Sequence, residues 1–200
     1  MLRKKIVLIG YLLLLVSCSK ADTNSERDTE TQAYFNRYAA AMQSNDTRFI
    51  NETIAYIDKV IQSGRPYISS AYYNKAQLLY RLKCYDDAVV TIVSAKNSDK
   101  DFYLATLYLR LGQKEKAIPI LDALFEKNRQ TLLEDKIDKK TKIHVGESTI
   151  IMLNLLQKDT SGFLDEMIHQ SVFTTEEVES MKGNSALQDT TTILSNLWPE

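Results

Sequence analysis

Cysteine and histidine, the side chains most often used in covalent and metal chemistry, are rare in this chain. The cysteines are Cys18 and Cys84, and the histidines are His144 and His169. Neither histidine has a cysteine near it at the spacing of a zinc site. The sequence contains no nucleophile elbow, glycine-rich phosphate loop or His-Glu-x-x-His motif. We therefore predict a protein that is not an enzyme and that holds no metal ion or cofactor.

Two pairs of adjacent carboxylates have a structural explanation. Asp86-Asp87 and Glu176-Glu177 lie where helices are expected to begin, and acidic side chains are favourable at helix N-termini. Cys84 falls in a predicted turn with no histidine near it in sequence, so we interpret it as a small half-buried residue. If Cys18 is modified, Cys84 has no partner and the chain has no disulfide framework.

The first seventeen residues have the layout of a secretory signal peptide. Arg3, Lys4 and Lys5 form a basic start, and Ile6 to Val16 is a run of eleven residues without a charge. A helix that spans a bilayer needs about 20 apolar residues, so this run is short for a membrane span.

The next residues, Leu15-Val16-Ser17-Cys18, resemble the lipobox of bacterial lipoproteins. The resemblance implies that residues 1–17 are removed and that the Cys18 thiol carries a diacylglycerol. Two or more acyl chains hold a protein stably on a membrane. It therefore implies a lipid-anchored protein of the bacterial cell envelope, on the periplasmic or surface-exposed face. Ser19 in place of aspartate favours the outer membrane. The alternatives are an ordinary signal peptide or an uncleaved anchor.

Composition bounds the remainder of the chain. Without residues 1–17 the chain keeps 22 basic and 26 acidic side chains, a net charge of −4, which is unlike a nucleic-acid-binding protein. Residues 18–30 include a single apolar residue after Cys18, Ala21, and we expect them to form a flexible tether. Residues 31–200 are rich in helix-forming residues and poor in glycine and proline, which predicts one all-α domain.

Helical spacing of apolar residues continues through this domain. It predicts helices over 31–44 and from about residue 47 to a stop at Ser63-Gly64. Further helices are expected over 149–156, 163–169, 176–181 and 186–198. Asp46 or Thr47, Asp159 to Ser161, and a Thr174–Glu177 capping box would begin three of them.

Residues 69–127 contain two helix–turn–helix segments that resemble tetratricopeptide repeats. In the first, Tyr72, Lys75-Ala76 and Leu79 are followed by Ala88, Ile92 and Ala95; in the second, Asp101, Leu104-Ala105 and Tyr108 are followed by Ala117, Leu121 and Leu124. The alanines fall where paired helices approach closely. The resemblance implies a short solenoid with a C-terminal helical cap, and residues 31–66 would form a degenerate first copy. Lys75, Asp101 and Pro119 depart from the pattern, and Pro119 should kink its helix. A generic helical hairpin bundle is the alternative.

In that family the first helices of the repeats line a concave groove. The resemblance therefore implies that a protein or peptide partner binds a face with the candidate residues Tyr73, Asn74, Gln77, Tyr80, Arg81, Phe102, Thr106 and Arg110. Arg81 and Arg110 occupy the same repeat position and would hold a carboxylate. A solvated face without a ligand is the alternative.

Together these features predict a membrane-anchored scaffold or adaptor that binds a protein or peptide. The alternative function is an immunity or ligand-capturing lipoprotein that protects the envelope. The sequence does not identify the partner.

Overall fold

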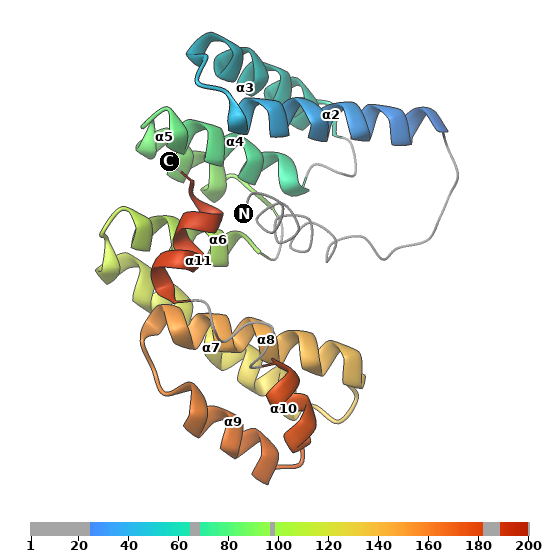
Figure 1. The fold of residues 1–200 in the computed structure, drawn as a ribbon, viewed down its shortest axis with the longest axis vertical. Coiled ribbons are helices and arrows are strands. Elements are labelled where there is room, and N and C mark those ends of the chain that lie inside the picture. The colour runs from blue at the N-terminus through green and yellow to red at the C-terminus, as the bar shows by residue number, and fades with distance from the viewer. Residues whose placement is uncertain (1–24, 65–68, 97–98, 182–188, 200) are drawn as a thin grey trace, which may run out of the picture. The chain divides into compact units, whose positions relative to one another are not determined.

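The computed structural model describes residues 25–64, 69–96, 99–181 and 189–199, which form ten helices and no strand (Figure 1). The expected all-α fold class, built from helical hairpins, is therefore confirmed. The described residues divide into two compact units, one that ends at Gly64 and one that begins at Ser69.

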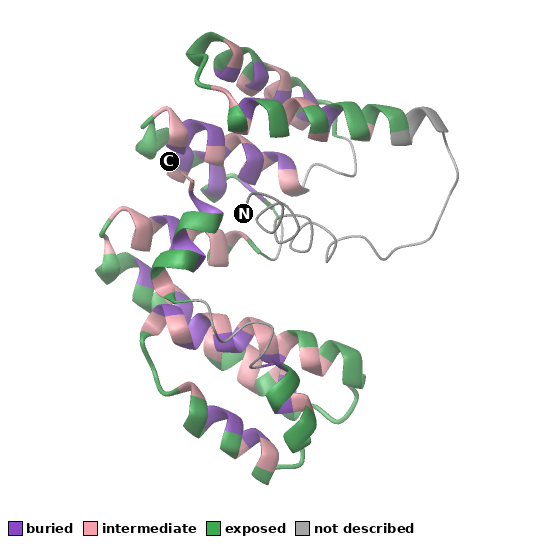
Figure 2. Ribbon diagram, in the orientation of Figure 1, coloured by how far each residue is buried: buried purple, intermediate pink, exposed green. Residues whose placement is uncertain are grey.

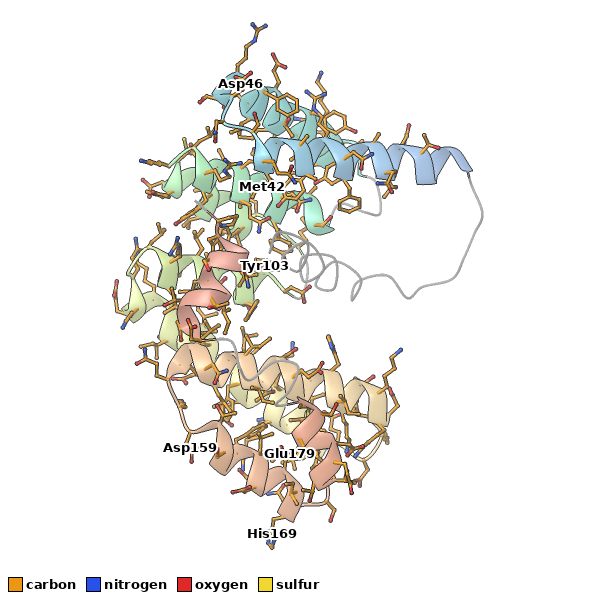
Figure 3. The ribbon with its side chains drawn as sticks, viewed as in Figure 1. Met42, Asp46, Tyr103, Asp159, His169 and Glu179 are labelled. Carbon is orange, nitrogen blue, oxygen red and sulfur yellow. The ribbon has the colours of Figure 1, made fainter. Side chains whose placement is uncertain are left out.

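The first unit contains α2 (Ser25–Gln43) and α3 (Thr47–Gln62). Helix α3 begins after Asp46, whose carboxylate accepts hydrogen bonds from the backbone N–H groups of Arg48 and Phe49 (Figure 3). It ends before Ser63 and Gly64, and Gly64 has a φ of 67°. Both ends thus follow the start and stop signals in the sequence.

Helix α2 begins earlier than the sequence analysis expected. Its first residue is Ser25, so the helix includes the last six residues of the segment 18–30 that was interpreted as a flexible tether. Once a helix has formed, each added residue contributes a backbone hydrogen bond at little further cost. The helix expected from residue 31 can therefore extend back into a polar segment. Residues 18–24 lie outside the described part of the chain.

The second unit opens with two helical hairpins. Helices α4 (Ser69–Arg81) and α5 (Tyr85–Val93) form the first, and α6 (Lys100–Arg110) and α7 (Lys114–Leu133) form the second. Helix α7 runs through Pro119 as one helix and ends six residues after the expected repeat limit at residue 127.

The hairpins share one packing pattern at an interval of 29 residues. The small residues at the helix contacts, Ala76 with Ala105 and Ala88 with Ala117, are all fully buried. Position 54, the expected counterpart of Ala88 in a first copy, is Ile54 and is only half-buried.

The hairpin turns are also equivalent. The N–H of Cys84 donates to the carbonyl of Leu79 at 2.9 Å, and the N–H of Gln113 donates to the carbonyl of Tyr108 at 2.8 Å. These six-to-one bonds close a helix C-terminus when the preceding residue is left-handed. The left-handed residue is Lys83 in the first turn, with φ 61°, and Gly112 in the second, with φ 76°.

The remaining helices are α8 (Lys139–Leu156), α9 (Thr160–His169), α10 (Thr175–Met181) and α11 (Thr190–Leu197). Helix α8 starts ten residues before the apolar stretch that predicted it, because Asp138 caps it through the N–H of Thr141. Asp159 caps α9, and Thr174 and Glu177 form the expected capping box at α10.

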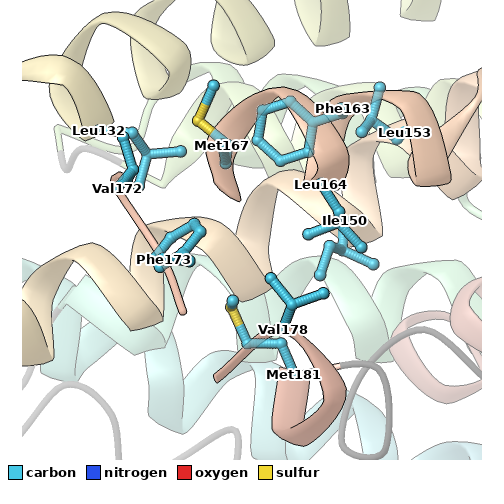
Figure 4. Close-up of a cluster of buried hydrophobic side chains, with 10 residues drawn as sticks. All are labelled: Leu132, Ile150, Leu153, Phe163, Leu164, Met167, Val172, Phe173, Val178 and Met181. Atoms are coloured by element: carbon cyan, nitrogen blue, oxygen red, sulfur yellow. The ribbon is translucent and has the colours of Figure 1, made fainter. Parts of the chain in front are cut away.

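A buried apolar cluster holds α8, α9 and α10 together with the end of α7 (Figure 4). The cluster includes Leu132, Ile150, Met167, Phe173 and Met181. These helices turn their apolar sides toward one another in this cluster, and their role as the cap of a solenoid stays a prediction. Helix α11 does not belong to the cluster.

Candidate functional site

The eight candidate partner-binding residues lie on two helices of the second unit. Tyr73, Asn74, Gln77, Tyr80 and Arg81 are on α4, and Phe102, Thr106 and Arg110 are on α6. Because the hairpins repeat every 29 residues, position 73 corresponds to 102, 77 to 106 and 81 to 110. The two helices therefore present equivalent positions on one face, which we call the α4–α6 face.

Arg110 and Tyr80 contact each other across this face. The Nε of Arg110 donates a hydrogen bond to the hydroxyl of Tyr80 at 2.9 Å, and Tyr80 is 7% exposed. The sequence analysis assigned Arg110, together with Arg81, to a ligand carboxylate. In this structure part of the Arg110 guanidinium instead positions a buried tyrosine.

Helix α11 lies against α6 on this face (Figure 1). Its apolar residues Ile193, Leu194 and Leu197 are buried together with Trp198, while most of its polar residues are exposed (Figure 2). Trp198, the single tryptophan of the chain, is fully buried.

Trp198 is held by both polar and aromatic contacts. Its Nε1 donates to the hydroxyl of Thr106 at 3.2 Å, and that hydroxyl donates to the carbonyl of Tyr103 at 2.9 Å. The indole ring lies with its centroid 5.7 Å from the ring of Tyr80. A buried indole N–H needs such an acceptor, so the position of Thr106 on α6 is matched to the tryptophan.

A second contact fixes the end of α11. The side-chain amide of Gln77 donates to the carbonyl of Leu197 at 2.6 Å. The last carbonyls of a helix have no partner within the helix, so Gln77 satisfies one of them from α4. The α4–α6 face thus binds a helix C-terminus followed by an aromatic side chain.

A stacked pair of tyrosines also joins α4 and α6. The rings of Tyr73 and Tyr103 are 3.9 Å apart between centroids and 17° from parallel. Burial, and to a smaller extent the negative charge of Asp99, raises the pKa of Tyr103 to about 12. Asn74, interpreted as a candidate peptide clamp, is 4% exposed and therefore has little surface to offer a ligand.

The structure divides the candidate residues into two groups. Tyr73, Asn74, Tyr80 and Thr106 are buried, while Gln77, Arg81, Phe102 and Arg110 are half-buried. The sequence reasoning missed Tyr103 and Trp198. Tyr103 occupies the same repeat position as Asn74. Since Asn74 was a candidate, the 29-residue interval could have identified Tyr103 as well. For Trp198 the signal was an apolar helical pattern that ends in the single tryptophan.

The cysteine and histidine side chains of the described residues lie on different elements. Cys84 precedes α5 and is exposed, so its interpretation as a half-buried residue was wrong. His169 lies at the end of α9 (Figure 3), and His144 Nδ1 is 3.9 Å from Glu147 Oε2. Among the described residues, no group of three histidine, cysteine, aspartate or glutamate side chains could hold a metal ion.

The leader and Cys18 lie outside the described residues, so the lipobox stays a prediction from sequence. None of the helices in the described part of the chain has the length and apolar character to cross a membrane.

No family model, curated protein or solved structure matches the chain.

Proposed function

We propose that this chain is a lipid-anchored protein of the bacterial cell envelope, on the outer membrane, that binds a protein or peptide partner and catalyses no reaction. The observation that carries the proposal is the leader, in which a basic start and an apolar run precede Leu15-Val16-Ser17-Cys18. Diacylglycerol on Cys18 would hold the helical units at the membrane surface.

The helical hairpins supply the second part of the proposal. We assign residues 69–127 to tetratricopeptide-like repeats, supported by the 29-residue interval and by the buried alanines at the helix contacts. The partner would bind the α4–α6 face, where tyrosine and arginine, frequent residues at binding hot spots, lie together.

The anchor is tested by Cys18→Ser in the native host. We expect the variant to lose radiolabelled palmitate and to leave the membrane fraction. Cys84→Ser is the matched control, because Cys84 is exposed and precedes α5 rather than the leader, and it should keep the label. Equal labelling of the Cys18→Ser variant and the wild type would disprove the lipoprotein assignment.

Partner binding is tested separately by photo-crosslinking in cells. A photoreactive residue at position 102, half-buried on α6, should form discrete protein adducts in the membrane fraction. The same residue at position 165, exposed on α9, is the control and should form none. The same adducts from both positions, or none from position 102, would exclude the α4–α6 face as the partner site.

A further inference from the structure

We infer that α11 is the resident ligand of the α4–α6 face, and that a partner binding there is a helical segment with a tryptophan at its C-terminal end that must displace α11. This inference rests on the proposed function, because it names the partner chemistry of the same face. It is carried by the contacts that this face makes with residues 190–198.

The contacts with α11 are those of a peptide-recognition site. Gln77 donates to the terminal carbonyl of Leu197, and Thr106 accepts from the indole of Trp198. The apolar side chains Ile193, Leu194 and Leu197 lie on one side of the helix and are buried. An amphipathic helix with apolar anchors at this spacing, laid on a complementary surface, is a common mode of peptide binding.

The face recognises polar atoms as well as apolar surface. A site built to hydrogen-bond an indole N–H discriminates against a side chain that lacks the donor, because its own acceptor then loses that partner. The partner segment should therefore carry tryptophan rather than phenylalanine. The Nε of Arg110 donates to Tyr80 and so supports the aromatic side chain against which the indole lies.

Release of α11 would leave the apolar cluster of α8, α9 and α10 intact. The helix has eight residues and lies outside that cluster, and the apolar side chains that it would expose are Ile193, Leu194, Leu197 and Trp198. A segment on a short linker has an effective concentration of roughly millimolar order. A partner that binds more tightly, or that is itself held at the membrane surface, competes with α11 at that concentration.

The first experiment uses the wild-type full chain. Because the chain has one tryptophan, labelling with 5-fluorotryptophan gives one fluorine resonance, from Trp198. An unlabelled peptide of residues 189–199 contains no fluorine and gives no signal in this spectrum. It can therefore be added to several millimolar, above the roughly millimolar effective concentration of the tethered segment. We expect a second resonance, from released Trp198, to grow with peptide concentration.

A peptide with alanine in place of tryptophan is the control and should leave the first resonance unchanged. A single unshifted resonance at the highest concentration of the native peptide would overturn the inference, because α11 would then not exchange.

The second experiment measures binding of a fluorescein-labelled 189–199 peptide by anisotropy. The full-chain Trp198→Ala variant, in which α11 loses its anchor, should bind the peptide about tenfold more tightly than the wild type. In the wild type, α11 of the same chain occupies the face most of the time, so only a small fraction of the molecules can bind the peptide. Asn196→Ala, at an exposed α11 position, should bind like the wild type. Adding Thr106→Val to Trp198→Ala should weaken binding roughly fivefold or more, since the indole loses its acceptor.

Equal affinity of Trp198→Ala and the wild type, or no binding by a Trp198→Ala chain with an intact helical spectrum, would refute the inference. Loss of the helical spectrum on Trp198→Ala would also refute it, since α11 would then be needed for folding. Neither experiment involves lipid or the natural partner, so a failure here is separate from a failure of the anchor or of crosslinking.

Discussion

Alanine side chains set the distance between the helices of each hairpin. Ala88 and Ala117 are fully buried at equivalent positions of α5 and α7. A leucine adds volume at a position that is already fully buried, and such overpacking costs roughly 1–3 kcal/mol. We expect Ala88→Leu and Ala117→Leu each to lower the free energy of unfolding by that amount in chemical denaturation.

Ala123→Leu on the exposed side of α7 is the matched control for this prediction. It should change the unfolding free energy by less than about 0.5 kcal/mol, as surface substitutions usually do. If both buried alanines tolerate leucine with an unchanged midpoint, the close approach of the paired helices is incorrect.

The two hairpin turns offer a test of backbone conformation at single residues. Lys83 and Gly112 are both left-handed, and a Cβ at Gly112 would have no atom within 4 Å. Any effect of Gly112→Ala is therefore conformational, and an L-residue in this region costs about 1–2 kcal/mol. We expect Gly112→Ala to destabilise the chain by roughly that amount in denaturant titration.

The reverse change should act in the opposite direction. Lys83→Gly removes the same backbone strain but adds freedom to the unfolded chain, so we expect a gain between 0 and about 1 kcal/mol. A loss of stability in Lys83→Gly would show that the lysine side chain, rather than the backbone, determines this turn.

At the scale of elements, one carboxylate adds a polar link to the apolar contact between α8 and α10. Glu177 Oε2 lies 2.7 Å from Lys139 Nζ and accepts a hydrogen bond from the N–H of Thr174 at 2.8 Å. The Lys139 contact first, and the Thr174 N–H second, hold the pKa of Glu177 below its ordinary value. The ionised form thus stabilises the start of α10 and its contact with α8.

This arrangement predicts an acid-sensitive contact. Since the folded pKa of Glu177 is lower than the unfolded one, its stabilisation is complete above about pH 4.3, the ordinary glutamate value. It is lost as the pH falls through the folded pKa. In melts across this range we expect Glu177→Gln to have a smaller loss of stability on acidification than the wild type.

Glu176→Gln, at the exposed neighbouring position, should keep the wild-type pH profile. Some acid sensitivity will remain in Glu177→Gln, because hydrogen bonds to Thr141 and Thr192 also lower the pKa values of the caps Asp138 and Asp189. A profile identical to that of the wild type would mean that Glu177 does not stabilise the folded chain through its charge.

Helix ends were predictable because their signals are local. Asp46, Gly64, Asp159 and the Thr174–Glu177 box act on backbone groups within a few residues of themselves. The early start of α2 was not predictable in the same way. A polar segment that reads as a tether becomes helical without contributing an apolar face, so periodicity carries no signal there.

At the scale of the whole chain, α11 connects segments far apart in sequence. Gln77 and Leu197 are separated by 120 residues, and Thr106 and Trp198 by 92. The hydroxyl of Thr190 also donates to the carbonyl of Asn154, at the end of α8. The sequence predicted both the face and an apolar last helix, but no local pattern links two such distant elements. Part of the face that was expected to be open is therefore covered by the chain itself.

The stability cost of losing Trp198 distinguishes a resident ligand from a part of the core. Truncating a large buried side chain in a core costs about 2–5 kcal/mol, and we expect this for Leu121→Ala, because Leu121 is fully buried within α7. For Trp198→Ala the loss cannot exceed the free energy of docking α11, since the chain can release that helix and keep the rest. We expect about 1–2 kcal/mol, because a tenfold preference for the docked state corresponds to about 1.4 kcal/mol.

Hydrogen exchange locates where each variant opens. In Trp198→Ala, faster exchange should be confined to residues 190–198. In Leu121→Ala, exchange should be faster throughout α6 and α7, because amides that exchange only when the whole hairpin opens are sensitive to its packing. Chemical denaturation followed by the helical circular dichroism signal gives the two unfolding free energies. If Trp198→Ala loses as much stability as Leu121→Ala, with faster exchange across the hairpins, then α11 is a permanent part of the fold and a partner cannot take its place.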